Sequence, residues 1–206
     1  MAVDSAALGA ERSQAVAPPP MASTIADPGP LGLSAFALTT FFLSAANAGW
    51  ISEAGEPAVL GVALFYGGIV QVFAGMWEFA KGNTFGATAF SSYGAFWLSL
   101  WYLLVYAKPE DVKGVGWFLL GWTIFTVIMW LASLRTNTAL LATFTVLLVT
   151  FACLSINDLQ GGGGGTFGRL GGYLGVVTAF LAWYAAAAGV VNNTHKRTVL
   201  PTWPRA

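Results

Sequence analysis

The chain has 206 residues, of which 56% are hydrophobic and only 9% are charged, and its formal net charge is zero. Soluble domains carry about 25% charged residues, so this composition excludes an ordinary soluble protein. The zero net charge also argues against nucleic acid as a partner, because binding to phosphates requires a basic surface.

Charge-free segments recur along the chain and predict six transmembrane helices. No Asp, Glu, Lys or Arg occurs in six intervals, each 21 to 26 residues long: 28–52, 57–77, 82–107, 114–134, 136–157 and 170–195. About 20 apolar residues span a bilayer as a helix. We therefore expect an all-α, six-helix transmembrane bundle with helix cores at 32–50, 58–78, 85–106, 115–134, 138–156 and 170–191. A β-barrel would instead show alternating segments of about ten residues.

The two ends of the chain are polar and predict tails on one side of the membrane. Residues 1–26 lack the hydrophobic segment of a signal peptide, so we expect a disordered tail there. Residues 27–194 form the expected transmembrane domain, and residues 195–206 a C-terminal tail. If the N-terminus is cytoplasmic, six Lys and Arg residues lie on that side and three on the other. Cytoplasmic loops carry the excess of Lys and Arg, so we expect both termini in the cytoplasm of a cell-membrane protein.

Glycines mark one loop and one helix face. The loop 160–166 contains five consecutive glycines and superficially resembles a phosphate-binding loop. No Gly-Lys-Ser/Thr follows it and it joins two membrane spans, so we interpret it as a flexible linker. The short connection 81–83 makes the second and third helices antiparallel neighbours. Gly171 and Gly175 form a GxxxG pair, which suits close packing between helices or subunits.

The residues needed for catalysis or metal binding are missing from the sequence. His195 is the only histidine, Cys153 is the only cysteine, and no Ser–His–Asp set or metal-ligating cluster is present. We therefore expect neither an enzyme nor a metal or cofactor site. Cys153 is expected to pack as a small apolar residue.

Polar side chains recur at helical spacing on four of the predicted helices and could line a path through the bundle. The sets are Phe36, Thr40, Leu43 and Asn47 on the first helix, Gly68, Gln71, Gly75 and Glu78 on the second, Thr88, Ser92 and Ser99 with Tyr93 beside them on the third, and Thr143, Leu147, Thr150 and Leu154 on the fifth. Polar groups in hydrocarbon are costly, so they usually face a bundle interior or a water-filled cavity.

Each of these residues also has a structural interpretation. Ser and Thr hydroxyls commonly donate to a carbonyl one turn earlier in their own helix. Asn47 lies near a helix end, where it could cap the helix or meet lipid headgroups. Glu78 lies one turn from Lys81 and could form an interfacial ion pair with it. Gln71 lies in mid-span between two glycines and is the strongest candidate for a functional or interhelical hydrogen bond.

The chemistry of these faces indicates a small, weakly bound solute. No Lys or Arg lies in the predicted membrane core, so a permanent anion would have no fixed counter-charge. Hydroxyls, amides and aromatic rings suit a solute that crosses neutral, or as an anion together with its proton. Simple carboxylic acids fit this profile, and so do urea, ammonia, glycerol and water.

Three motifs stand out against this general pattern. The first is the segment of Asp27, Pro28, Gly29, Pro30, Leu31, Gly32 and Leu33, the second is FYGGIVQVFAGMWEFAKGNTFGATAFSSYGAFW at 65–97, and the third is RTVLP at 197–201. Together they resemble the acetate uptake transporter family, also called the succinate–acetate permeases, whose first helix opens with Asn-Pro-Ala-Pro-Leu-Gly-Leu. Asp27 replaces the family's Asn and Gly29 replaces its Ala. The Asp side chain can still cap the helix.

The resemblance implies a six-helix protomer that encloses its own pore and assembles into a hexamer. It implies import of acetate, and in some members succinate, together with protons. The family's Phe–Tyr–Leu constriction falls on Phe36, Tyr93 and Leu147, with the Tyr93 hydroxyl available to a carboxylate oxygen. The expected solute path beside the constriction is lined by Thr40, Asn47, Gln71, Glu78, Thr88 and Ser92.

Two other functions share these features. A passive channel for acetate or small neutral solutes would have the same pore without obligatory proton coupling. A membrane sensor or scaffold would show no flux, although the predicted tails are too short to hold an output domain.

Overall fold

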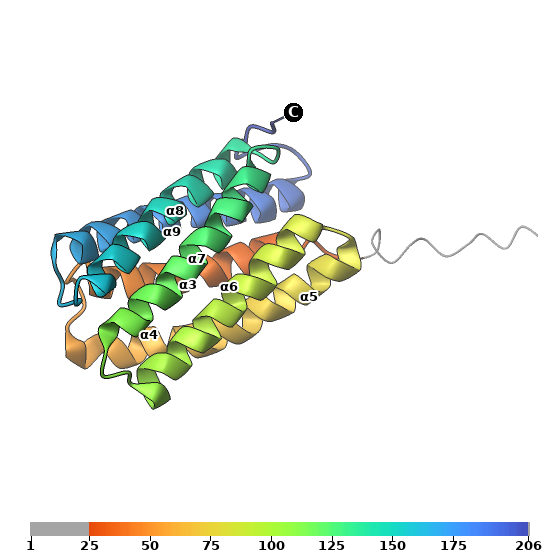
Figure 1. Ribbon diagram of the computed structural model, residues 1–206. Coiled ribbons are helices and arrows are strands. Elements are labelled where there is room, and N and C mark those ends of the chain that lie inside the picture. Colours follow the sequence, from red (N-terminus) through yellow and green to blue (C-terminus); the bar gives the residue numbers. More distant parts are fainter. Residues whose placement is uncertain (1–24, 206) are drawn as a thin grey trace, which may run out of the picture.

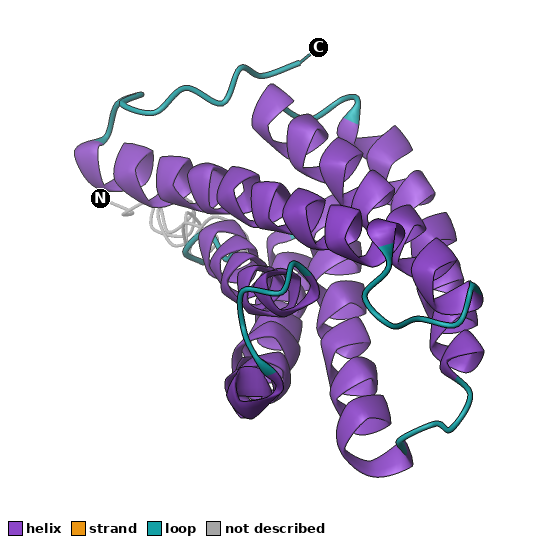
Figure 2. Cartoon of the chain, turned by 90° about the vertical axis from the view of Figure 1, so that its left-hand side faces the viewer, coloured by secondary structure: helices purple, strands orange, loops and turns teal. Residues whose placement is uncertain are grey.

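The structure, a computed structural model, describes residues 25–205 and consists of helices joined by short loops (Figure 1, Figure 2). Residues 1–24, nearly all of the predicted N-terminal tail, and residue 206 lie outside the described residues. The α-helices are α3 (Gly29–Asn47), α4 (Glu56–Val62), α5 (Gln71–Lys81), α6 (Thr84–Tyr102), α7 (Val112–Ser133), α8 (Thr138–Leu159) and α9 (Thr166–His195). A 3₁₀ turn, η1 (Glu53–Gly55), precedes α4, and the π-helical segments η2 (Ala63–Val70) and η3 (Leu103–Ala107) follow α4 and α6.

Each of the six predicted spans corresponds to a helical segment, although the first helix ends at Asn47 rather than at 50. The elements α4, η2 and α5 form one continuous segment over Glu56–Lys81. Within residues 25–205, five segments are long and apolar enough to span a membrane, namely α3, Glu56–Lys81, α7, α8 and α9. The helix α6 also lacks charged residues, although it is not one of these five segments. The prediction of an all-helical protein is therefore confirmed.

Side-chain caps and one glycine determine where several helices begin and end. Asn83 caps α6 by accepting a hydrogen bond from the Gly86 amide at 3.2 Å, and Asn137 caps α8 by accepting from the Leu140 amide at 2.9 Å. Gly82 ends α5 with a φ of 78°, a conformation that glycine adopts without steric cost. The resulting tight turn makes α5 and α6 antiparallel neighbours, as the sequence predicts (Figure 1).

The predicted GxxxG pair packs α9 within the chain. A Cβ added to Gly171 would lie 2.7 Å from the Leu154 side chain of α8, and Gly175 faces Ser44 of α3. The missing side chains let α9 lie close to both helices, as small residues do in membrane bundles. Because α3 also contacts α5, α6 and η2, it lies at the centre of the bundle.

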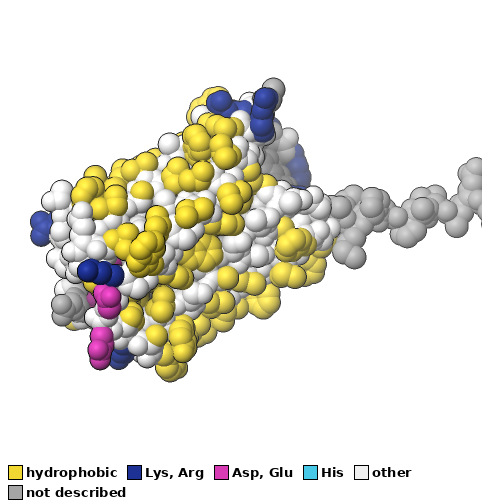
Figure 3. Space-filling model, viewed as in Figure 1, with side chains coloured by type: hydrophobic (Ala, Val, Ile, Leu, Met, Phe, Trp, Pro, Cys, Tyr) yellow, Lys and Arg dark blue, Asp and Glu magenta, His cyan; other side chains and the backbone are white. Residues whose placement is uncertain are grey.

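Apolar side chains cover much of the long outer face, and charged side chains lie near the ends of the bundle (Figure 3). The exposed large apolar residues include Phe73, Trp77, Trp117, Ile124, Ile128 and Phe180. An apolar band bounded by charges is what contact with lipid requires. Lys81, Arg135, Lys196, Arg197 and Arg205 belong to the end where both described termini lie, whereas Lys108, Lys113 and Arg169 belong to the opposite end.

The C-terminal segment 198–205, predicted to be part of a tail, folds back onto the bundle, and we call it the C-terminal strap. Asn192 of α9 holds its beginning through three hydrogen bonds. The Asn192 Oδ1 accepts from the amides of Val199 at 2.7 Å and Leu200 at 2.9 Å, and its Nδ2 donates to the Leu200 carbonyl at 2.8 Å. One carboxamide therefore pairs the backbone groups of Val199 and Leu200 at the beginning of the strap.

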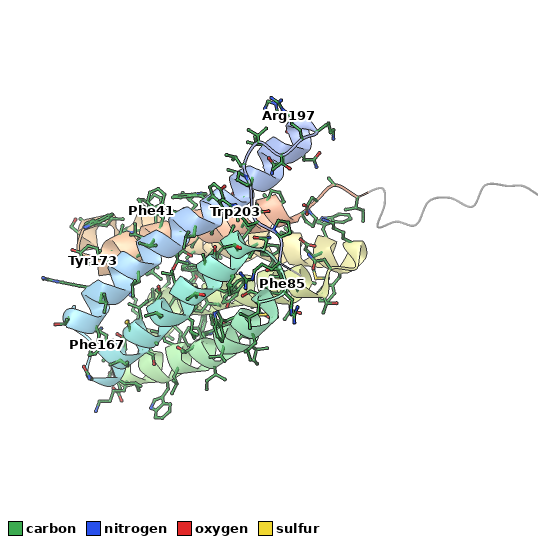
Figure 4. The ribbon with its side chains drawn as sticks, turned by 90° about the horizontal axis from the view of Figure 1, so that it is seen from above. Phe41, Phe85, Phe167, Tyr173, Arg197 and Trp203 are labelled. Atoms are coloured by element: carbon green, nitrogen blue, oxygen red, sulfur yellow. The ribbon has the colours of Figure 1, made fainter. Side chains whose placement is uncertain are left out.

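The second half of the C-terminal strap is fixed to α8 and α9. The Tyr184 hydroxyl donates to the Pro201 carbonyl at 2.6 Å, and the Trp203 carbonyl accepts from the Thr138 amide at 3.0 Å. Figure 4 shows Arg197 at the far end of α9 and Trp203 lying back towards the other helices. The strap therefore closes over the end of the bundle where the termini lie.

Candidate functional site

Two cavities enter the bundle from opposite ends. The termini-side cavity, about 330 Å³ in volume, lies among the first turns of α3 and α6 and the last turns of α5 and α9, and its lining includes Asp27 and Glu78. The glycine-loop cavity, about 630 Å³ in volume, lies at the opposite ends of α3 and α6 and at the end of α8, and its lining includes Asn47, Asn157 and Gly163. Both cavities therefore combine apolar walls with a few polar groups.

The predicted constriction residues lie between these cavities on three helices. On each helix, the predicted constriction residue lies in the sequence between a residue that lines the termini-side cavity and a residue that lines the glycine-loop cavity. These flanking residues are Leu33 and Leu43 for Phe36 on α3, Phe90 and Leu100 for Tyr93 on α6, and Phe144 and Leu154 for Leu147 on α8. The three helices thus carry their predicted residues at one intermediate level of the bundle.

At that level the side chains form one buried cluster. Phe36, Tyr93 and Leu147 are 6%, 2% and 3% exposed and belong to the same hydrophobic core. The ring centroids of Phe36 and Tyr93 are 5.8 Å apart, and those of Phe144 and Phe151 lie 6.2 and 6.4 Å from that of Tyr93. The fold therefore separates the two cavities with an apolar, largely aromatic layer.

The Tyr93 hydroxyl points to α7, which differs from the expectation that it is available to a carboxylate. Its oxygen lies 2.9 Å from the Thr126 Oγ1, and Thr126 itself donates to the Trp122 carbonyl at 2.7 Å. Thr126 has only one hydroxyl proton, so both contacts are hydrogen bonds at once when Thr126 donates to the carbonyl and Tyr93 donates to Thr126. The proton that would bind a carboxylate oxygen is therefore already engaged.

Glu78 lies in the termini-side cavity rather than in an ion pair with Lys81. The Lys81 Nζ is 2.6 Å from the Asp27 Oδ1, which also accepts from the Gly29 amide at 3.1 Å. Glu78 is 1% exposed, and its Oε2 has no hydrogen-bond partner among the described residues. A Cβ added to Gly86 would lie 2.7 Å from the Glu78 Cδ. The carboxyl group thus fits against a glycine in the first turn of α6.

The signature segment forms the first turns of α3. The Asp27 Oδ1 accepts from the Gly29 amide, but the N-cap position of α3 is Pro28, so Asp27 bonds the first turn from one residue before the cap. Pro30 and Leu33 line the termini-side cavity, Gly32 faces the Phe90 ring, and Leu31 is exposed on the outer surface. Asp27 also joins this turn to α5 through Lys81, so its negative charge is balanced at the mouth of the cavity.

Two predicted path residues are buried between the cavities without partners. Gln71 is 1% exposed and Thr40 is 5% exposed. Neither the Gln71 amide atoms nor the Thr40 Oγ1 has a hydrogen-bond partner among the described residues. Gly68 and Gly75, on either side of Gln71, face Leu98 and Ser91 of α6 rather than a cavity. The polar face predicted on the second helix, which the structure divides between η2 and α5, is therefore partly a helix-packing face.

The remaining path residues are dispersed. Asn47 lines the glycine-loop cavity. Ser92 lines a shallow groove on the outer surface between α6 and α7, and Thr88 is half-buried and lines neither cavity. The sequence analysis missed Asn157, which is 9% exposed and lines the glycine-loop cavity beside Asp158. The adjacent amide and carboxylate at the end of an otherwise apolar helix could have indicated this polar lining.

The glycine run forms a shaped turn that lines a cavity. Residues 161–164 all have positive φ, between 70° and 108°, which side chains with a Cβ rarely adopt. The Gly162 amide donates to the Asn157 carbonyl at 2.9 Å, and Gly163 and Gly164 line the glycine-loop cavity. The run links two spans, as predicted, but it is built into the mouth of the cavity.

The fold and these cavities define a multi-pass helical membrane protein whose two cavities are separated by an aromatic layer. The chain belongs to the GPR1/FUN34/yaaH family, which it matches over residues 9–205. The resemblance inferred from the three sequence motifs is therefore confirmed.

Two relatives and one solved structure are similar to this chain over most of its length. Acetate permease A of Emericella nidulans is 40% identical over 198 residues, which cover 87% of this chain and 66% of that protein. The succinate-acetate/proton symporter SatP of Escherichia coli (strain K12) is 38% identical over 182 residues, which cover 86% of this chain and 95% of that protein. The structure of the bacterial acetate channel SatP superposes with a TM-score of 0.82 at 38% identity, covering 86% of this chain and 99% of that one.

Proposed function

We propose that this chain is a membrane transporter that imports acetate together with protons, and that succinate or other small carboxylates share its path. The observation that carries this proposal is the pair of cavities at opposite ends of the bundle, separated by the layer of Phe36, Tyr93 and Leu147. The named relatives, an acetate permease and a succinate-acetate/proton symporter, support the substrate class.

The chemistry of each level suits a small carboxylic acid. Amide groups such as Asn47 and Asn157 in the glycine-loop cavity can donate to a carboxylate, and Glu78 in the other cavity offers a free carboxyl oxygen. The aromatic layer excludes hydrated ions and packs against a methyl group. Weak binding at several sites favours flux, because the solute must leave as readily as it enters.

Polar groups beside the layer can assist passage. The buried Gln71 amide and the Thr40 hydroxyl have no protein partners within residues 25–205. Burying such groups unpaired costs about 1–3 kcal/mol each, so a passing solute or water that bonds to them recovers that free energy. Both residues are therefore proposed to hydrogen-bond the carboxylate next to the constriction.

A passive acetate channel is the second candidate, because the structurally similar bacterial protein is described as a channel. Uptake of radiolabelled acetate into proteoliposomes separates the two, with protein-free liposomes measuring diffusion of acetic acid through lipid. One arm imposes an inside-alkaline pH gradient, and the other imposes a potassium diffusion potential at equal pH. The readout is the initial rate above that of protein-free liposomes.

The two mechanisms respond to different gradients. Symport of one proton with one acetate is electroneutral, so the pH gradient accelerates uptake and the potential does not. A channel for the acetate anion responds to the potential, with faster uptake when the inside is positive. Uptake that follows the potential and ignores the proton gradient would refute the symport proposal, and a complete lack of flux would favour a sensor or scaffold.

We also propose a homo-hexamer in the cell membrane with both termini in the cytoplasm. The resemblance to the family supports the hexamer, and native mass spectrometry in detergent tests it. The concentration of Lys and Arg at the end of the bundle near both described termini supports the orientation. The orientation is tested by replacing Thr198 with cysteine and treating intact cells with a membrane-impermeant maleimide. Labelling of this cysteine from outside the cell would contradict a cytoplasmic C-terminus.

A further inference from the structure

The helices α6 and α7 meet through aromatic side chains at the level of the constriction. The Tyr93 ring centroid lies 5.3 Å from that of Phe125 and 6.1 Å from that of Trp122. Shallow grooves on the outer surface follow this seam, one of them beside Trp122 and Phe125. By contrast, α5 and α6 approach closely at a glycine, where a Cβ on Gly94 would lie 2.9 Å from the Val72 nitrogen. Side chains, rather than close backbone contact, therefore set the position of Tyr93 relative to α7.

One directional contact crosses this seam at Tyr93. Its hydroxyl donates to the Thr126 Oγ1 at 2.9 Å, and Thr126 donates onwards to the Trp122 carbonyl at 2.7 Å. Thr126 is 0% exposed and Tyr93 is 2% exposed, so water does not compete for this chain of donors. In a site of low dielectric constant, such linked hydrogen bonds strengthen one another.

The contacts of the Tyr93 ring with its aromatic neighbours are less directional than its hydrogen bond. Its ring contacts with Phe36, Phe125 and Phe151, at centroid distances of 5.3 to 6.4 Å, are attractive over a range of tilts. A hydrogen bond weakens steeply once its angle falls away from linearity. The bond to Thr126 is therefore the contact that selects one ring position among those that packing permits.

We propose that Thr126 of α7 is a positioning residue that holds the Tyr93 ring across the path and thereby sets the largest carboxylic acid that the protein admits. This inference rests on the proposed transport of acetate. Because Thr126 accepts the phenolic proton, the constriction presents an aromatic ring rather than a hydroxyl donor to the solute. Selection at this level then depends on the volume of the acid, so acetate passes more readily than butyrate.

The test compares initial rates of acetate and butyrate uptake into proteoliposomes, each corrected with protein-free liposomes. Thr126→Val keeps the shape of the side chain and removes the hydroxyl, whereas Thr126→Ser retains it. Tyr93→Phe removes the same bond from the other side and keeps the ring. Thr123→Val is the matched control, because Thr123 lies on the same helix and its hydroxyl donates only to the Leu119 carbonyl, at 2.8 Å.

We expect the butyrate-to-acetate ratio to rise about 3- to 18-fold in Thr126→Val, the range that corresponds to losing one hydrogen bond between membrane helices. Tyr93→Phe should raise the ratio equally. The double variant should add nothing, because both changes remove one bond. Thr126→Ser and Thr123→Val should keep the wild-type ratio.

Several outcomes would overturn the inference. A fall of both rates at an unchanged ratio in Thr126→Val indicates a structural role only, and multiplied effects in the double variant indicate that Thr126 does not act through Tyr93. If the wild type takes up acetate but Thr126→Val leaves the butyrate-to-acetate ratio unchanged, the inference is rejected and the proposed function stands. Absence of uptake in the wild type rejects both. If Thr126→Val fails to fold, as judged by gel filtration in detergent, Tyr93→Phe tests the bond alone.

Discussion

Replacing Gly75 with alanine should force α5 and α6 apart. A Cβ at this position would lie 2.6 Å from the backbone nitrogen of Ser91, whereas an ordinary contact begins at 3.4 Å. Because the opposing atom belongs to the backbone, no side-chain rotation relieves the overlap, and α6 has to retreat by about 0.8 Å. Overpacking of this kind costs about 1–3 kcal/mol of folding free energy.

The matched control is Gly121→Ala on α7, where the added Cβ would meet nothing within 4 Å. Both changes replace a glycine inside a helix, so the gain in helix propensity of about 1 kcal/mol is common to both. The difference in unfolding free energy between the two variants, measured by denaturant titration in mixed micelles, isolates the steric cost. Equal unfolding free energies for Gly75→Ala and Gly121→Ala would refute the argument from close packing.

Three further predictions follow from single side chains. Phe36→Ala opens the layer between the cavities and should raise butyrate uptake relative to acetate, and an unchanged ratio would contradict its assignment. Asn192→Ala removes three bonds to the C-terminal strap and should speed proteolytic removal of the strap, whereas Asn193→Ala, whose side chain contacts Lys196, should not. Asp27→Asn keeps an acceptor for the first turn but breaks the ion pair, which is partly exposed, so chemical denaturation should show a loss of at most about 1 kcal/mol.

Part of the site could be predicted because it depends on local sequence. Asn47 lines a cavity at the end of its helix, Leu147 belongs to the same buried core as Phe36 and Tyr93, and the rings of Phe36 and Tyr93 meet. The partners of polar groups could not be predicted in the same way. The acceptor of the Tyr93 proton is on α7, a helix that its composition marks as nearly uniformly apolar.

The ion-pair partner of Lys81 could not be predicted from sequence spacing either. Sequence spacing offered Lys81 a partner one turn away in Glu78, but the ammonium group contacts Asp27, 54 positions earlier in the chain. The start of α3 lies against the end of α5, so the distant carboxylate is the nearer one in space. Glu78 lines the termini-side cavity, and its Oε2 has no hydrogen-bond partner among the described residues.

The sequence by itself determined that the protein is helical, where its apolar spans lie and which family it belongs to. The spans can be read from the sequence because each charged residue is costly in lipid whatever its neighbours are. The family can be read from it because each motif is a contiguous stretch of residues. Only the tertiary structure decided that the tail at 198–205 is a strap, that the glycine run lines a cavity, and that Tyr93 donates to Thr126. Each of these depends on which groups from distant helices meet, and the short range and strict geometry of hydrogen bonds make that outcome a property of the fold.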